Sequence, residues 1–116
     1  MTIQLTKMTL ATTRTVEMVR FYDALFETQF QAQEIQGATF YNGTLAGIPI
    51  LICPNEVARV EAEQSRHQLA VRVADLKSLL GQVESAGGLI ETPITESMTE
   101  AILRDPDGNT IEVIQA

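Results

Sequence analysis

The feature that most constrains the fold of this chain is an internal repeat with a constant offset. The segment Lys7–Thr12 aligns with Gln68–Val73, and the segment Gly47–Ile52 aligns with Gly108–Val113, in both cases 61 positions later. An offset that is kept over about 45 residues, across different kinds of local pattern, predicts two structurally equivalent modules.

Each copy of the repeat opens with a strand pattern that is followed by a helix pattern. Apolar residues first alternate with other residues, which is the period of a half-buried strand. These residues are Met8 and Leu10 in the first copy and Leu69, Val71 and Val73 in the second. Apolar residues then recur at helical spacing. These are Met18, Val19, Tyr22, Leu25 and Phe26, and in the second copy Leu76, Leu79, Leu80 and Val83.

The rest of each copy has room for three more strands. We expect the middle two at residues 30–35 and 38–45, and again at 89–92 and 99–104. The segment Asp105–Gly108 has Asp, Pro and Gly at the places that favour a type I turn. In the first copy Asn42-Gly43 is a good hairpin signal, whereas the repeat places the turn at Ala46-Gly47.

These patterns predict an α+β fold made of two tandem βαβββ modules. One module alone leaves one face of its sheet uncovered, so we expect the two to form a curved eight-stranded mixed sheet with helices outside and a central cleft. The whole chain, 1–116, is then a single domain. Module one spans about 5–54 and module two about 66–116, and a linker at about 55–65 contains a helical turn.

Composition excludes several classes of partner and location. The net charge is −7 and only 8 residues are Lys or Arg, which argues against a nucleic-acid partner. Apolar runs fall far short of the roughly 20 residues of a membrane helix, so no membrane is expected. Met1–Lys7 has no signal-like segment. The single cysteine, Cys53, allows no intrachain disulfide and fits a cytoplasmic location.

Three segments carry a family resemblance. Asp105–Gln115 looks like the closing hairpin of the glyoxalase/bleomycin-resistance/extradiol-dioxygenase superfamily, which has the vicinal-oxygen-chelate fold. Leu69–Leu76 is similar to the strand-to-helix entry of its modules, and Phe21–Phe26 is similar to the helix of its first module. The resemblance implies a fold shared by lyases, isomerases, dioxygenases and binding proteins, and small members of this kind are expected to form homodimers.

The resemblance also implies four metal-ligand positions, which fall on Lys7, Leu51, Gln68 and Glu112. Glu112 is a good ligand and Gln68 an acceptable one through its amide oxygen. Leu51 cannot bind a metal, and the ammonium of Lys7 would repel it. We therefore expect no cofactor. Binding of a divalent Zn, Ni, Mn or Fe ion by Gln68 and Glu112 remains an alternative. His67 could join these two ligands only through a bulge in the strand; otherwise it lies at the strand end, away from the cleft.

The alternation of strand sides predicts which residues face the cleft. With Glu112 as the one candidate catalytic carboxylate, the residues that alternation turns toward the ligand are Lys7, Thr9, Leu51, Cys53, Gln68, Arg72 and Ile114. Phe40 and Arg104 are added as residues that could line the cleft. Three of them have a second interpretation. Lys7 could form an ion pair with Glu112 in place of the metal or face solvent, Cys53 could be a buried apolar filler, and Arg104 could brace the neighbouring turn.

The first functional hypothesis is a protein that binds a small molecule in its cleft without the usual metal site. The alternative is a divalent-metal-dependent lyase, isomerase or dioxygenase of the same superfamily that uses Gln68 and Glu112. A third hypothesis, association with another protein, has no positive support in the sequence. The two leading hypotheses differ in one property, which is whether the chain binds a metal ion.

Overall fold

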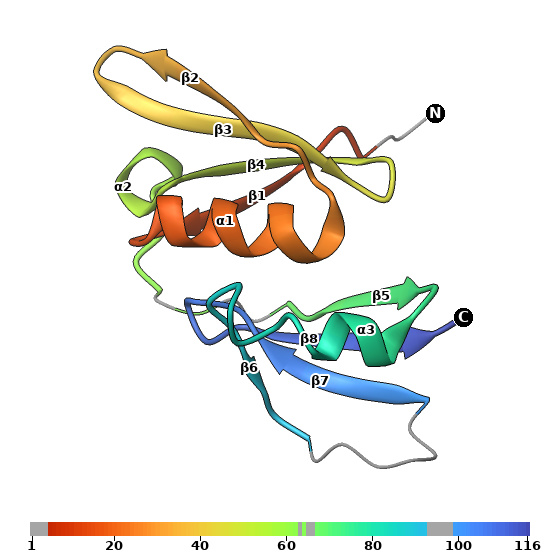
Figure 1. Cartoon of the computed structure of the whole chain (residues 1–116). Coiled ribbons are helices and arrows are strands. Elements are labelled where there is room, and N and C mark those ends of the chain that lie inside the picture. Colours follow the sequence, from red (N-terminus) through yellow and green to blue (C-terminus); the bar gives the residue numbers. More distant parts are fainter. Residues whose placement is uncertain (1–4, 63, 65–66, 93–98) are drawn as a thin grey trace. The chain divides into compact units, whose positions relative to one another are not determined.

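The computed structural model describes residues 5–62, 64, 67–92 and 99–116. The chain divides between Glu61 and Ala62 into two compact units, which we call module one and module two and describe separately (Figure 1). This boundary lies inside the segment that was predicted as the linker. No helix in the described ranges is long and apolar enough to cross a membrane.

Module one contains one four-stranded sheet, one long helix and one short helix. Its elements are β1 (Met8–Thr12), α1 (Thr15–Phe26), β2 (Gln31–Ile35), β3 (Ala38–Leu45), β4 (Ile48–Pro54) and α2 (Asn55–Ala58). The strand order is β1-β4-β3-β2, with β1 parallel to β4 and the other pairs antiparallel. The short helix α2 is the helical turn predicted for the linker.

Module two repeats this arrangement with shorter elements. They are β5 (Leu69–Val73), α3 (Leu76–Leu80), β6 (Leu89–Ile90), β7 (Glu100–Arg104) and β8 (Thr110–Gln115). The strand order is β5-β8-β7-β6, again with a parallel first pair. The predicted α+β fold of two βαβββ modules is therefore confirmed, with the eight strands divided into two mixed sheets of four. The predicted cleft involves both modules and stays a prediction.

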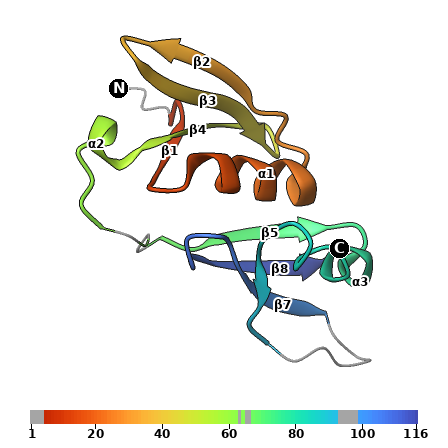
Figure 2. The same cartoon turned by 60° about the vertical axis from the view of Figure 1, so that its left-hand side comes forward.

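The core of each module lies between the sheet and its longer helix. In module one, β4 turns Ile50 and Ile52 toward α1, which lies along one face of the sheet (Figure 2). The residues that α1 buries are Met18, Phe21, Tyr22 and Leu25. In module two, α3 packs on β8, and alternate residues of β7 and β8 are buried; these are Ala101, Leu103, Ile111 and Val113. Burying each larger apolar side chain contributes about 1.5–3 kcal/mol.

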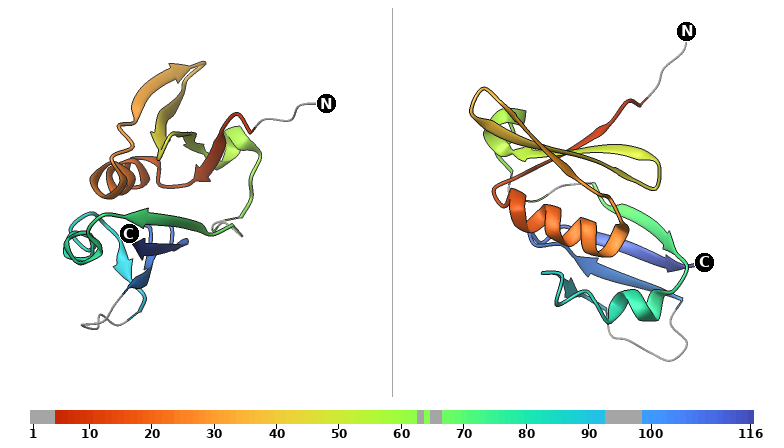
Figure 3. Two further views of the ribbon diagram at one scale, coloured as in Figure 1. Left: turned by 90° about the vertical axis from the view of Figure 1, so that its right-hand side faces the viewer. Right: turned by 45° about the horizontal axis from the view of Figure 1, so that its top comes forward.

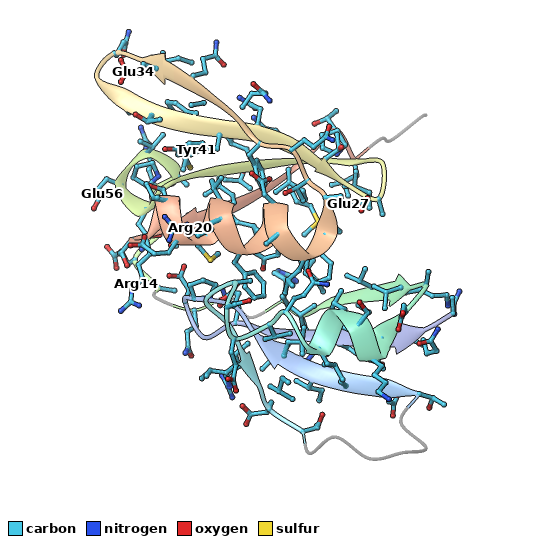
Figure 4. All side chains as sticks on the ribbon, in the orientation of Figure 1. Arg14, Arg20, Glu27, Glu34, Tyr41 and Glu56 are labelled. Carbon is cyan, nitrogen blue, oxygen red and sulfur yellow. The ribbon has the colours of Figure 1, made fainter. Side chains whose placement is uncertain are left out.

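The two helices end differently because their sequences offer different groups. α1 ends without glycine, so Glu27 adopts the left-handed conformation with φ 54°, at the end of α1 in Figure 4. The carboxylate of Asp23 then accepts hydrogen bonds from the Thr28 hydroxyl (2.6 Å) and the Phe30 amide (3.0 Å). These bonds fix the path from the helix into β2.

In module two, α3 stops at Leu80, earlier than the predicted helical pattern, which ran to Val83. Turns follow it, and Val83 is nevertheless fully buried. The start of α3 is held by Asp75, whose carboxylate accepts a hydrogen bond from the Ser78 amide at 3.1 Å. The Gln115 side chain adds a second tie, because it accepts from the Leu76 amide at 2.8 Å. Gln115 thus joins the end of β8 to the start of α3.

Both hairpins of module one close with two-residue turns. Gln36-Gly37 has φ values of 51° and 82°, and Ala46-Gly47 has values of 50° and 84°. Positive φ at both positions is the mark of a type I′ turn, which matches the twist of the adjoining strands. The turn placed by the repeat, at Ala46-Gly47, is therefore correct, and Asn42-Gly43 lies inside β3.

Gly43 is required in β3 by a close approach of the backbone rather than by a turn. A Cβ atom at this position would lie 2.8 Å from the Thr28 carbonyl oxygen and 2.8 Å from the ring of Phe30. The same carbonyl accepts a hydrogen bond from the Thr44 amide at 3.2 Å. The segment after α1 therefore crosses β3 here, in space that any larger residue would occupy.

Candidate functional site

The candidate site residues lie on one side of each sheet, which we call the far face. It is the face opposite α1 in module one and opposite α3 in module two, and each far face takes every second residue of the strands. In module one it includes Thr9 and Ala11 of β1, Phe40 and Asn42 of β3, and Leu51 and Cys53 of β4. In module two it includes Ala70 and Arg72 of β5, Ile102 and Arg104 of β7, and Thr110, Glu112 and Ile114 of β8.

The centre of the far face of module one is apolar. Leu51 is half-buried and lies between Thr9 of β1 and Asn42 of β3 in the hydrogen-bonded register. Phe40, also half-buried, lies on the same side of β3 two residues from Asn42. The family resemblance places a metal ligand at Leu51, and the structure surrounds that position with a hydroxyl, an amide and an aromatic ring.

Cys53 lies on the far face and is only 1% exposed. It sits at the end of β4, where α2 packs against both β4 and β1, and Figure 3 shows α1 and α2 on opposite sides of the sheet. Burial raises the pKa of the Cys53 thiol, and the positive charge of Lys7 opposes this rise. The thiol is therefore kept protonated and packed, which supports the interpretation of Cys53 as an apolar filler.

Lys7 precedes β1 and is exposed. Its positive charge acts on the Cys53 thiol, whose pKa it lowers against the effect of burial. Within the described part of the chain Lys7 makes no hydrogen bond or ion pair. The ion pair predicted between Lys7 and Glu112 would join the two modules, and it stays a prediction.

The far face of module two is more polar. The amide nitrogen of Gln68, just before β5, donates a hydrogen bond to the Thr110 hydroxyl at 2.9 Å. Glu112 is half-buried and lies between Ala70 on β5 and Ile102 on β7. The sequence prediction omitted Thr110, although its position two residues before Glu112 on the same strand was a signal that could have identified it.

The next pair along β5 and β8 is Arg72 and Ile114. Arg72 is exposed and Ile114 is half-buried. Both therefore lie on the same face as Glu112, one pair further along the strands. Their role in binding a ligand stays a prediction.

Arg104 is held by its own module. Its guanidinium forms an ion pair with Glu91 at 2.7 Å and donates a second hydrogen bond to the Gly108 carbonyl at 2.6 Å. The hydrogen bond and the charge of Arg104 lower the pKa of Glu91, and Glu91 in turn raises the pKa of Arg104. Arg104 thus braces the β7–β8 turn through a backbone carbonyl. The sequence offered no signal for Glu91, because its pairing depends on the register of β6.

The residues at the four implied ligand positions do not fit a divalent metal site. Two of them, Lys7 and Leu51, have no lone pair to offer at neutral pH. His67 is exposed, just before β5. Across residues 5–62, 64, 67–92 and 99–116, no three side chains of the His, Cys, Asp or Glu type are grouped to hold a metal ion. A catalytic divalent site normally uses about three protein ligands, and the implied set supplies Gln68 and Glu112.

Comparison with solved structures shows the same fold in proteins of low sequence identity. A glyoxalase-related enzyme from Fulvimarina pelagi is 18% identical with a TM-score of 0.75, covering 98% of this chain and 89% of its own. A mutant of the fosfomycin resistance protein FosX from Listeria monocytogenes, complexed with Mn(II) and 1S,2S-dihydroxypropylphosphonic acid, is 13% identical with a TM-score of 0.77, covering 98% and 93%. TnmS3, an antibiotic binding protein from Streptomyces sp. CB03234, is 16% identical with a TM-score of 0.69, covering 99% and 98%.

Sequence comparison identifies the family directly. None of the curated proteins matches this chain. The profile of the glyoxalase-like domain matches residues 7–114, which is nearly the whole chain and includes both modules. This match shows that the chain belongs to the glyoxalase-like domain family.

Proposed function

We propose that this protein binds a small organic molecule on the far faces of its sheets, without a resident divalent metal. The observation that carries the proposal is the half-buried Leu51 side chain, which stands at an implied ligand position on the far face of module one. An apolar residue at this position cannot bind a metal, and it offers an apolar surface to the carbon atoms of a ligand. Small-molecule sites are mostly apolar with a few polar groups that fix orientation.

The surroundings of Leu51 supply both kinds of group. Phe40 offers a half-buried aromatic ring on the neighbouring strand, while Thr9 and Asn42 offer a hydroxyl and an amide. Aromatic rings give a ligand a large apolar contact with a preferred geometry. This combination supports a planar or aromatic ligand that presents one or two hydrogen-bonding groups.

The relatives support both hypotheses in different degrees. TnmS3 is described as an antibiotic binding protein, which favours binding as a function of this fold. The FosX complex contains Mn(II), which favours the alternative of a divalent-metal lyase, isomerase or dioxygenase. For this chain the alternative would need at least one donor beyond Gln68 and Glu112, since two ligands rarely hold a catalytic ion. The donor chemistry therefore favours binding without a metal.

The proposal can be tested with a panel of planar aromatic compounds, using thermal shift to find ligands and calorimetry to measure Kd. We expect Leu51→Asp to weaken binding at least tenfold, about 1.4 kcal/mol, because it places a charge in the apolar contact. Val16→Asp is the matched control, since Val16 is 54% exposed on α1, away from the far face. Failure of the whole panel to bind, or equal weakening by both variants, would contradict the proposal.

A further inference from the structure

Among the described residues of module two, no side chain pairs with the Glu112 carboxylate. It is half-buried, and the residues directly beside it on the two adjoining strands are Ala70 and Ile102, neither of which has a polar side chain. Within the described part of the chain Glu112 makes no hydrogen bond or ion pair. A partly buried charge costs free energy unless something pairs with it, so this carboxylate is suited to an external partner.

In the described part of module two, Arg72 and Arg104 are the cationic side chains on this face, and neither forms an ion pair with Glu112. Arg104 lies across from Thr110, and its guanidinium is committed to Glu91 and to the Gly108 carbonyl. Arg72 lies across from Ile114, one pair further along β8, and it makes no ion pair with Glu112. Of these two cations, Arg104 thus pairs with a different acid, Glu91.

One of the neighbouring polar groups adds a free acceptor. The amide nitrogen of Gln68 is bonded to the Thr110 hydroxyl, which leaves the Gln68 carbonyl oxygen able to accept a further hydrogen bond. Ala70, between Gln68 and Arg72 on the same face, extends only a methyl group. Because Ala70 is exposed and small, its side chain does not cover the Glu112 carboxylate on the β5 side.

We propose that Glu112 and Gln68 form a recognition site for an organic cation, such as the primary ammonium or amidinium group of the ligand. This inference rests on the proposed function and specifies its ligand. An ammonium group has three donors, which suit a carboxylate and one or two neutral acceptors, and charge-assisted hydrogen bonds of this kind are the stronger ones. The net charge of −7 also favours the approach of a cation.

The site suits an organic cation better than a metal ion. A divalent ion requires several oxygen, nitrogen or sulfur ligands in a fixed geometry, and the far face of module two offers Glu112, Gln68 and Thr110 for this purpose. An organic cation brings its own carbon framework, which can rest on apolar neighbours such as Ile102 and Ile114. Only the cation uses both the charge and the apolar surface around it.

The test compares two probes of almost the same shape, 2-phenylethylammonium and neutral 2-phenylethanol, by amide chemical-shift titration of isotope-labelled protein. We expect the ammonium compound to shift the amides of residues 68–72 and 110–114 and to bind at least tenfold more tightly than the alcohol. Glu112→Gln, which preserves shape and removes charge, should abolish that preference. Glu84→Gln is the matched control, because Glu84 is exposed and lies in the turns that follow α3, outside the strands of the far face.

A second variant keeps the test decisive if Glu112→Gln perturbs the fold. Ala70→Arg would place a guanidinium directly beside Glu112, and we expect this internal cation to block 2-phenylethylammonium. Equal binding of both probes, unaffected by Glu112→Gln, would overturn the cation site while leaving small-molecule binding intact. Failure of both probes to bind at any accessible concentration would count against the cation site, and the aromatic panel would then decide the proposed function separately. Saturable Mn²⁺ binding that is lost in Glu112→Gln would assign the carboxylate to a metal instead.

Discussion

Module one closes both of its hairpins with two-residue turns, whereas module two closes its last hairpin with the loop 105–109 between β7 and β8. In module one the backbone conformation alone makes the turn. In module two a buried carboxylate makes it, because Asp105 accepts hydrogen bonds from the amides of Asp107 (3.0 Å) and Asn109 (2.9 Å). The two modules thus reach the same strand order by different local interactions.

The two modules also differ in the residue that fills the core beside equivalent positions of β4 and β8. Gly43 pairs with Ile50, and Leu103 pairs with Ile111, which is the repeat equivalent of Ile50. Leu103 is fully buried under the helix, whereas the ring of Phe30 lies against Gly43. A leucine from the strand in one module is therefore replaced by a phenylalanine from the preceding segment in the other. The side chain that fills this part of the core thus comes from a different segment in each module.

The largest effects on stability should come from substitutions at these two packed positions, Leu103 and Gly43. Leu103→Ala leaves a cavity under α3, and we expect it to lower the free energy of unfolding by about 2–5 kcal/mol. Gly43→Ala should cost about 1–3 kcal/mol, because its Cβ would press on a backbone carbonyl that cannot move aside. Chemical denaturation measures both values. A neutral Gly43→Ala would show that the two positions are not packed as the structure indicates.

The next effect should come from the buried turn of module two. Asp105→Ala removes the acceptor for the amides of Asp107 and Asn109, and we expect a loss of about 2 kcal/mol, since hydrogen bonds to charged groups are worth about 1.5–3 kcal/mol. Asp105→Asn keeps one acceptor oxygen and should lose less. Equal denaturation midpoints for Asp105→Ala and the parent protein would contradict this role.

A smaller effect of opposite sign is expected in the turn of module one. Ala46 has φ 50°, where a Cβ atom is unfavourable, so Ala46→Gly should stabilise the protein by about 0.5 kcal/mol. Ala32→Gly in β2 is the control and should destabilise it, because strand glycines lose more conformational freedom on folding. If both changes move the thermal midpoint in the same direction, the left-handed conformation at Ala46 is not strained.

The smallest effect should be the pH dependence of the ion pair between Glu91 and Arg104. The pKa of Glu91 is lower in the folded protein than in the unfolded chain, so the pair stabilises the fold above the unfolded pKa of about 4.3 and loses this effect as the pH falls through the folded pKa. Glu91→Gln should therefore be less stable than the parent at pH 7 and equal to it in strong acid. Because both groups are exposed, high salt should reduce the difference at pH 7.

The sequence predicted the fold well because the repeat carries information that a single segment does not. Asn42-Gly43 has the stronger local turn signal, yet the turn lies at Ala46-Gly47, where the second copy places it. The local signal failed because Gly43 serves a packing purpose, which is visible only when the segment around Phe30 is placed. The helix of module two was predicted too long because burial of Val83 continues after the helical hydrogen bonds end.

The candidate site could be predicted only in part. Strand alternation was enough to group Gln68, Arg72 and Glu112 on one face, since side chains alternate in any strand. It could not show that Arg104 is held by Glu91, because that pair depends on the register between β6 and β7. It allowed two interpretations of Cys53, a cleft thiol and a buried filler, and the side chain is 1% exposed in the structure.

The central claim is that this glyoxalase-like domain does not bind a divalent metal at the positions its family resemblance implies. Elemental analysis tests it most directly, on untagged protein dialysed against Mn²⁺, Fe²⁺, Ni²⁺ and Zn²⁺ in turn and then desalted. We expect a metal content far below one ion per chain, and the same content in the parent protein and in Glu112→Gln. A content near one ion per chain that disappears in Glu112→Gln would contradict it and would establish the metal-dependent alternative.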